Sequence, residues 1–218
     1  MNWILALRAI AQYQIITALC LYDHGIGNED VRHLTDALQY NTILITLDLS
    51  FNHITDTEVQ YLSAALKNNS TLQSLNLRSN QIRNQGAQYL ADGLRHNKTL
   101  KTLDLYRNHI GDDGAQALAS ALITNTTLDS LNLDGNLSTY CVTVGAAVAI
   151  RKNQTLSLYK HPMQENDIQH LANALRNSMT LTTLDLYKNG LGNNGAKYLA
   201  DAVEYNTVIS ILSIIYLQ

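Results

Sequence analysis

Proline, cysteine and charge are all scarce in this sequence of 218 residues. Pro162 is the single proline, and Cys20 and Cys141 are the two cysteines. Two cysteines are too few for the disulfide framework of a small secreted domain. Charged residues make up 15% of the chain and the net charge is −3, which disfavours nucleic acid as a ligand, because nucleic-acid binding needs a concentrated basic face. The 46% of apolar residues exclude a disordered chain.

Long apolar runs are also missing. No stretch reaches the roughly 18 apolar residues that a membrane-spanning helix needs. The first ten residues, MNWILALRAI, contain Arg8 inside their apolar stretch, which argues against a secretory signal peptide. We therefore predict a protein that is not bound to a membrane and works in the cytoplasm.

Leucine and asparagine, in contrast, are abundant, with 36 and 22 copies. Most of them belong to an internal repeat, the first feature to look for in a sequence of this kind. Pairs of the form Leu-x-Leu, or their equivalents, recur at intervals of 28 residues, with a single interval of 25. The pairs start at Leu19, Leu47, Leu75, Leu103, Leu131, Leu156, Leu184 and Leu212.

Each repeat contains two different patterns. The Leu-x-Leu stretch alternates apolar and polar residues, which predicts a short strand. The segments 86–97 and 114–125 space their apolar residues as an amphipathic helix does: Ala87, Leu90 and Leu94 in the first, Ala115, Leu118 and Leu122 in the second. Five repeats carry a residue suited to cap a helix at the equivalent place before the predicted helix. These residues are Asn28, Asp56, Asn84, Asp112 and Asn193.

Strands separated by helices must run parallel, with right-handed crossovers. One repeat cannot bury its own apolar face, so the repeats must stack and share a core. Helices are wider than the strand spacing, which bends such a stack toward its strands. The sequence thus predicts an α/β solenoid shaped like a horseshoe, with a parallel sheet on its concave face and helices on its convex face. We assign residues 1–218 to one domain with about eight strands and a helical N-terminal cap over about residues 1–14.

The sequence pattern of the repeat resembles that of a known family. Leu72, Leu75, Leu77, Asn80 and Ile82 fit the pattern LxxLxLxxNxL of the leucine-rich repeat, and the next repeat fits it again. The period of 28 with a full helix resembles the ribonuclease-inhibitor type. The N-x-T-L and GA-x-x-LA-x-L segments are similar to repeat arrays of effectors from intracellular bacteria, Legionella among them, and to those of NOD-like immune receptors.

Polar side chains between the leucines form the most informative surface. Strand alternation directs them to the side opposite the core, and tyrosine and arginine are favoured in binding hot spots. We predict that this concave face binds a partner protein. The predicted partner-binding residues are Tyr22, Asp48, Phe51, Arg78, Asp104, Tyr106, Arg107, Tyr159, Lys160, Asp185, Tyr187 and Lys188.

Other polar residues are better explained by structural roles than by catalysis or ligand binding. The asparagine column formed by Asn52, Asn80, Asn108, Asn136 and Asn189 should satisfy backbone groups of adjacent repeats, with His24 and His161 replacing asparagine in two repeats. The histidines fall on different elements, so no metal, cofactor or catalytic site is predicted. The sequons at Asn69, Asn97, Asn125 and Asn153 recur because the helix-to-strand turn recurs; we do not expect glycosylation.

One region departs from the repeat. Residues 140–150, YCVTVGAAVAI, occupy a helix position but contain poorer helix formers, and the repeat after them has lost three residues. We predict that the ladder of strands continues through this deletion and that stability is lowest around residues 137–165.

These observations favour a non-enzymatic module that binds a folded protein. The resemblance to ribonuclease inhibitor implies that binding inhibits or regulates the partner, and the resemblance to effectors implies a bacterial protein secreted into a host cell. Two alternatives stay open: the ligand-sensing repeats of a NOD-like receptor, and a GTPase-activating protein of the Ran-activating type. We also predict self-association through the apolar C-terminal end.

Overall fold

The computed structural model describes residues 16–151, 153, 155–158 and 163–213, so the predicted N-terminal cap and the last five residues lie outside the described part. The chain forms two compact units, residues 1–137 and 138–218, which are described separately. The prediction of one domain over residues 1–218 stays a prediction. In the described part, no helix combines the length and apolarity that crossing a membrane would require.

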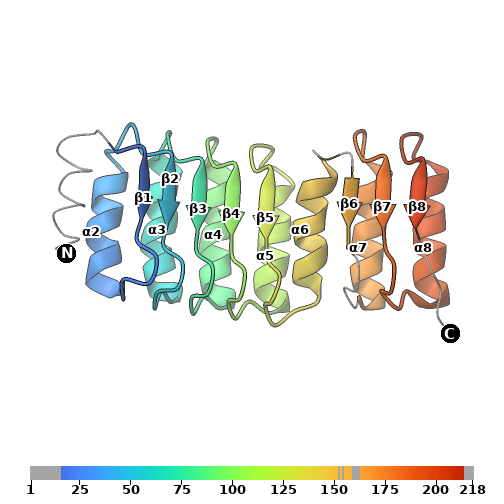
Figure 1. Cartoon of the computed structure of the whole chain (residues 1–218), viewed down its shortest axis with the longest axis horizontal. Coiled ribbons are helices and arrows are strands. Elements are labelled where there is room, and N and C mark those ends of the chain that lie inside the picture. Colours follow the sequence, from blue (N-terminus) through green and yellow to red (C-terminus); the bar gives the residue numbers. More distant parts are fainter. Residues whose placement is uncertain (1–15, 152, 154, 159–162, 214–218) are drawn as a thin grey trace. The chain divides into compact units, whose positions relative to one another are not determined.

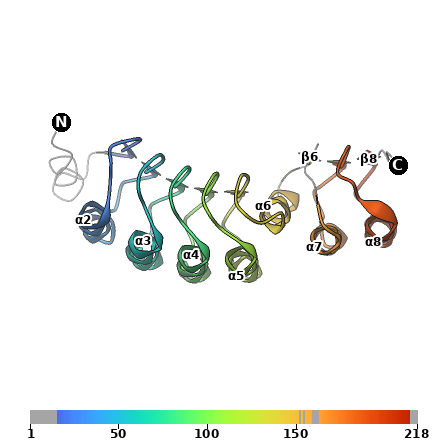
Figure 2. The same cartoon turned by 90° about the horizontal axis from the view of Figure 1, so that it is seen from below.

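In the described residues of the first unit, 16–137, five strands alternate with four helices (Figures 1 and 2). Its elements are β1 (Ala18–Cys20), α2 (Asn28–Leu38), β2 (Thr46–Asp48), α3 (Asp56–Asn68), β3 (Ser74–Asn76), α4 (Asn84–His96), β4 (Thr102–Asp104), α5 (Asp112–Leu122) and β5 (Ser130–Asn132). The strands pair in parallel and in chain order, so that Leu47, Leu75 and Leu103 are register partners. Figure 2 shows the helices of this unit on one side of its sheet.

The second unit repeats this arrangement on a smaller scale. It contains α6 (Tyr140–Ile150), β6 (Thr155–Ser157), α7 (Glu165–Arg176), β7 (Thr183–Asp185), α8 (Gly192–Glu204) and β8 (Ile211–Ser213). Its strands form a separate three-stranded parallel sheet. The prediction of one uninterrupted ladder was therefore wrong: the eight strands are divided between two sheets, and the division falls at the repeat that has lost three residues in its helix-to-strand connection.

The leucines of the repeat form the core. Leu47, Leu49, Leu75, Leu77 and Leu103 are at most 1% exposed, and the predicted apolar face of α4 is buried with them. Burying a leucine side chain contributes about 2 kcal/mol. Because leucines recur every 28 residues, stacked repeats bring them together in a shared hydrophobic core. In the second unit, Ile150 of α6 is also fully buried, which places this irregular helix in that unit's core.

Four of the five residues of the first asparagine column form a structural ladder, as predicted. Each Nδ2 donates to the carbonyl of a leucine in the preceding repeat and to one in its own repeat, while each Oδ1 accepts from an isoleucine N–H. This set contains Asn52, Asn80, Asn108 and Asn136. His24, at the equivalent position, contacts the Tyr22 carbonyl through ring Nδ1 at 2.6 Å, as Asn52 Nδ2 contacts the Ser50 carbonyl; His161 lies outside the described residues.

A second asparagine ladder lies at the helix-to-strand turns. Asn97 donates from Nδ2 to the Leu66 carbonyl at 2.7 Å, and its Oδ1 accepts from the Leu100 N–H at 2.7 Å. Asn69 and Asn125 make the same contacts one repeat away. These three sequon asparagines are buried, so their amide nitrogens are committed to the fold. Asn153, at the equivalent position, is exposed.

Two of the five predicted helix caps, Asp56 and Asn84, act on the helix of the next repeat rather than on their own. The residues that precede α3 and α4 are Thr55 and Arg83, and the predicted caps Asp56 and Asn84 are the first helical residues. Asp56 Oδ1 instead accepts from the N–H groups of Arg83 and Gly86, at 2.7 and 2.8 Å, and so caps α4 of the next repeat. This contact explains the glycine, because a Cβ at position 86 would lie 2.5 Å from Asp56 Oδ1.

Candidate functional site

The turns that follow strands β1 to β4 carry a row of aromatic and cationic side chains that contact one another. Tyr22 and Phe51 face each other with ring centroids 5.0 Å apart. The Arg78 guanidinium carbon lies 5.7 Å from the Phe51 ring and 4.4 Å from the Tyr106 ring. The Arg107 guanidinium carbon lies 5.2 Å from the centre of the Tyr106 ring. We call these five residues the aromatic–cation row.

The row is accessible as well as ordered. Tyr22 is 47% exposed and Phe51 is 39% exposed, although both are large aromatic side chains. Arg107 is exposed, and Arg78 and Tyr106 are half-buried between their neighbours. Each cation–π contact at such a site contributes about 0.5–1 kcal/mol. The row is therefore a surface whose side chains are held in place before any partner arrives.

A recurrent left-handed turn brings two columns of the repeat into this row: the column of Tyr22, Arg78 and Tyr106, and the column one residue later, with Phe51 and Arg107. Phe51 has φ 55° and Arg107 has φ 51°, and the equivalent Asp23, Ser79 and Lys188 share this conformation. Such φ values are uncommon outside glycine. The turn follows each strand and places residues of one column beside residues of the neighbouring column in the adjacent repeat. Tyr22 thus meets Phe51, although the two belong to different columns of the sequence pattern.

The aspartates of the strands have a structural task that the sequence did not reveal. Asp48 Oδ1 accepts from the Ser50 N–H at 2.8 Å, and Asp104 Oδ1 accepts from the Tyr106 N–H at 2.8 Å. Asn76 makes the same contact with the Arg78 N–H. Carboxylates and amides at this position therefore close the turn after the strand, and Asp48 and Asp104 are only half exposed.

The second unit presents a shorter version of this surface. Lys188 Nζ lies 5.2 Å from the centre of the Tyr187 ring. Asp185 Oδ1 accepts from the Tyr187 N–H at 3.0 Å, and its other oxygen accepts from the Ser157 hydroxyl. The predicted residues Tyr159 and Lys160 lie outside the described part of the chain, so their place on this surface stays a prediction.

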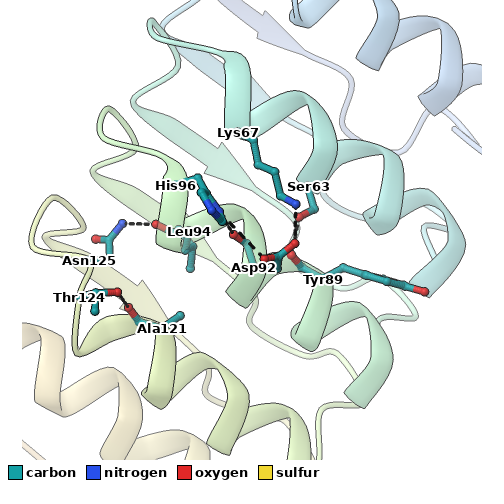
Figure 3. A network of polar contacts seen from close by, with 9 residues as sticks. All are labelled: Ser63, Lys67, Tyr89, Asp92, Leu94, His96, Ala121, Thr124 and Asn125. Carbon is teal, nitrogen blue, oxygen red and sulfur yellow. Dashed lines mark hydrogen bonds and ion pairs between the residues drawn. The ribbon is translucent and has the colours of Figure 1, made fainter.

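The helical face of the first unit differs in character (Figure 3). Lys67 of α3 forms an ion pair with Asp92 of α4, and His96 Nδ1 donates to the Asp92 backbone carbonyl at 2.9 Å. The hydrogen bond from Lys67, aided by the nearby charges of Lys67, His96 and Arg95, holds the pKa of Asp92 below its ordinary value despite an opposing contribution from desolvation. The Ser63 hydroxyl donates to the Tyr89 carbonyl, close to Gly93. These contacts join consecutive helices through paired polar groups.

Sequence reasoning thus identified the residues of the row and missed their connections. Tyr22, Phe51, Arg78, Tyr106 and Arg107 were all predicted, but their contacts with one another were not. The contacts depend on the left-handed turn, which no glycine marks in four of these repeats. Among the described residues, no group of three His, Cys, Asp or Glu side chains is arranged to hold a metal ion.

Comparisons with known proteins agree with the repeat. Residues 40–63, 68–91, 96–119 and 177–200 match the model of the leucine-rich repeat family. No curated protein sequence matches the chain. Among solved structures, actin-binding site 2 of leiomodin-1 is 29% identical, with a TM-score of 0.58 over 61% of this chain and 79% of that one. The tropomodulin C-terminal domain of Caenorhabditis elegans is 10% identical, with a TM-score of 0.46 over 94% and 93% of the two chains.

The repeat period, the parallel strands, the helices on one side of each sheet and the four matching segments agree. This chain carries leucine-rich repeats, folded as an α/β solenoid.

Proposed function

We propose that the protein is a non-enzymatic module that binds a folded partner protein through the sheet face of its first unit. The aromatic–cation row carries this proposal. An ordered and partly exposed row of two tyrosines, one phenylalanine and two arginines matches the composition of binding hot spots.

The rigidity of the sheet supports the same role. Side chains that are already held by ring and cation contacts lose little conformational entropy when a partner binds. The leucine-rich repeats and the leiomodin-1 likeness also support a protein-binding module. Because the similar part of leiomodin-1 is an actin-binding site, actin is the first defined partner to test.

Finer features of the proposal rest on sequence resemblance. We expect binding to inhibit or regulate the partner, and we expect the protein to act as a bacterial effector in the cytoplasm of a host cell. These expectations would place the partner among host proteins or other effectors.

The test uses face variants and a matched helix variant. Tyr106→Ala removes the ring that lies between Arg78 and Arg107, and Tyr61→Ala removes a similarly large, 37% exposed ring from α3. Binding to monomeric and filamentous actin is measured first, by calorimetry and co-sedimentation. The wild type and both variants are then used to capture partners from host-cell lysate, with quantitative mass spectrometry.

The expected result is a partner that Tyr106→Ala weakens by about thirtyfold, the effect of losing a central hot spot of ~2 kcal/mol, with Tyr61→Ala unchanged. If every partner of the wild-type chain is lost with Tyr61→Ala and retained with Tyr106→Ala, the sheet face is not the binding surface. If the chain captures other proteins and does not bind actin, actin is excluded as the partner and the protein-binding function still stands.

A further inference from the structure

The two arginines of the aromatic–cation row lack anionic partners within the described part of the chain. Neither guanidinium has a carboxylate within ion-pair distance there, whereas Lys67 and Lys101 are both paired, with Asp92 and Asp129. Arg78 Nε is buried and has no hydrogen-bond partner among the described residues. A buried donor without an acceptor costs about 1–3 kcal/mol, so Arg78 carries an unmet hydrogen-bonding demand.

Two nearby carboxylates, those of Asp48 and Asp104, do not pair with Arg78 and accept hydrogen bonds within the fold instead. The Asp48 carboxylate accepts from the Ser50 N–H, the Ser50 hydroxyl and Asn76 Nδ2. Asp104 accepts from the Tyr106 N–H. These hydrogen bonds hold the negative charges at the strands, whereas Arg107 lies beyond the strand end and is exposed.

The geometry of the row prepares both arginines for a planar anion. Stacking on Tyr106 orients the Arg78 guanidinium, whose N–H groups lie along its edge rather than on the stacked face. A carboxylate can accept two parallel hydrogen bonds from such an edge. The aromatic rings beside it offer apolar contact to the rest of an incoming side chain.

On this basis, and resting on the proposed function, we propose that the row recognises an acidic segment of the partner protein, in which Asp or Glu carboxylates bind Arg78 and Arg107 and an adjacent apolar side chain packs on Phe51 and Tyr106. The occupant is defined by charge complementarity: two cations that are unpaired among the described residues, spaced by one aromatic ring, select carboxylates. The row then supplies specificity through charge and affinity through its rings.

The experiment selects peptides from a random 12-residue display library on the immobilised full chain. Selected peptides are synthesised and their affinities measured for wild type, Arg78→Gln, Arg107→Gln and Tyr106→Ala. Arg95→Gln, near the end of α4, is the matched control for loss of one positive charge. Each peptide is also made with Asp and Glu replaced by Asn and Gln, and circular dichroism confirms that the variants fold.

The expected result is enrichment of Asp and Glu in the selected peptides. Their affinity falls at least about tenfold with Arg78→Gln, with Arg107→Gln and with the amide peptides, and falls with rising salt, while Arg95→Gln is silent. Peptides without acidic enrichment that still lose binding with Tyr106→Ala would overturn this inference and leave the proposed function standing. Peptides that no row variant weakens, or the absence of any selected peptide, would overturn the inference and count against the proposed function as well.

Discussion

Asn76 Nδ2 donates a hydrogen bond of 3.1 Å to the Asp48 carboxylate on the adjacent strand. The two residues are register partners, and Asn76 is in turn the register partner of Asp104. Asp and Asn therefore alternate across the first sheet from β2 to β5, which ends with Asn132. This alternation keeps carboxylates off directly opposite positions.

We predict that Asn76→Asp destabilises the first unit by about 1 kcal/mol, because three carboxylates then lie on consecutive strands and like charges opposite each other repel. Urea denaturation at low and at high salt measures the effect, which should shrink as salt screens the charges. Asn76→Ser, which removes the amide without adding charge, is the control. Equal stability of the Asp and Ser variants would contradict the electrostatic account.

Loss of a buried turn asparagine should be far more costly. We predict that Asn97→Ala lowers the free energy of unfolding by about 3 kcal/mol or more, because the Leu66 carbonyl and the Leu100 N–H lose their buried partner. Asn153→Ala is the matched control from an exposed sequon, with an expected change within about 0.5 kcal/mol. Thermal unfolding compares them; similar losses would show that the ladder contact is unimportant.

The left-handed turn position predicts a stabilising change. Ser79 has φ 53°, and its hydroxyl is buried without a hydrogen-bond partner among the described residues. Glycine adopts this conformation freely, so Ser79→Gly should stabilise by about 0.5–1 kcal/mol, the left-handed cost of ~1–2 kcal/mol less the flexibility of glycine.

The reverse change at the equivalent position, Gly135→Ala, should destabilise, since Gly135 has φ 71° and a Cβ there would lie 3.0 Å from Arg107 Cγ. Chemical denaturation measures both variants. A stability loss in Ser79→Gly would refute the strain argument.

The cap between repeats can be tested by hydrogen exchange. Asp56→Ala removes the acceptor of the Arg83 and Gly86 N–H groups, at a cost of about 1 kcal/mol. Exchange should accelerate most at the start of α4, in the following repeat, and less at the start of α3, which keeps its Thr55–Glu58 capping box. The opposite order would mean that Asp56 acts on its own helix.

The Lys67–Asp92 pair predicts a modest dependence on pH. Because the pKa of Asp92 is lowered in the folded state, its stabilisation is present above the ordinary aspartate range and is lost as pH falls through the lowered value. The pair is solvent-exposed, so its contribution stays below about 1 kcal/mol. NMR titration of Asp92 should show its pKa rising in Lys67→Met; an unchanged pKa would contradict the assigned cause.

The sequence alone determined the repeat and most of its consequences. The period of 28 predicted the eight strands, the buried leucines and the first asparagine ladder. Each of these depends on the local sequence pattern and on the stacking of equivalent residues from successive repeats. It also identified the residues of the aromatic–cation row: strand alternation turns Tyr22, Arg78 and Tyr106 away from the core, and Phe51 and Arg107 stand one position later in the repeat.

Only the tertiary structure decided which residues act on one another. Asp56 caps the helix of the next repeat, Asn97 is buried although it reads as a sequon, and Arg78 stacks on rings from two neighbouring repeats. The division of the strands into two sheets at the shortened repeat was likewise not foreseen. Each of these outcomes depends on contacts between residues about 28 positions apart, and the relative placement of such residues follows from packing and turn geometry rather than from local pattern.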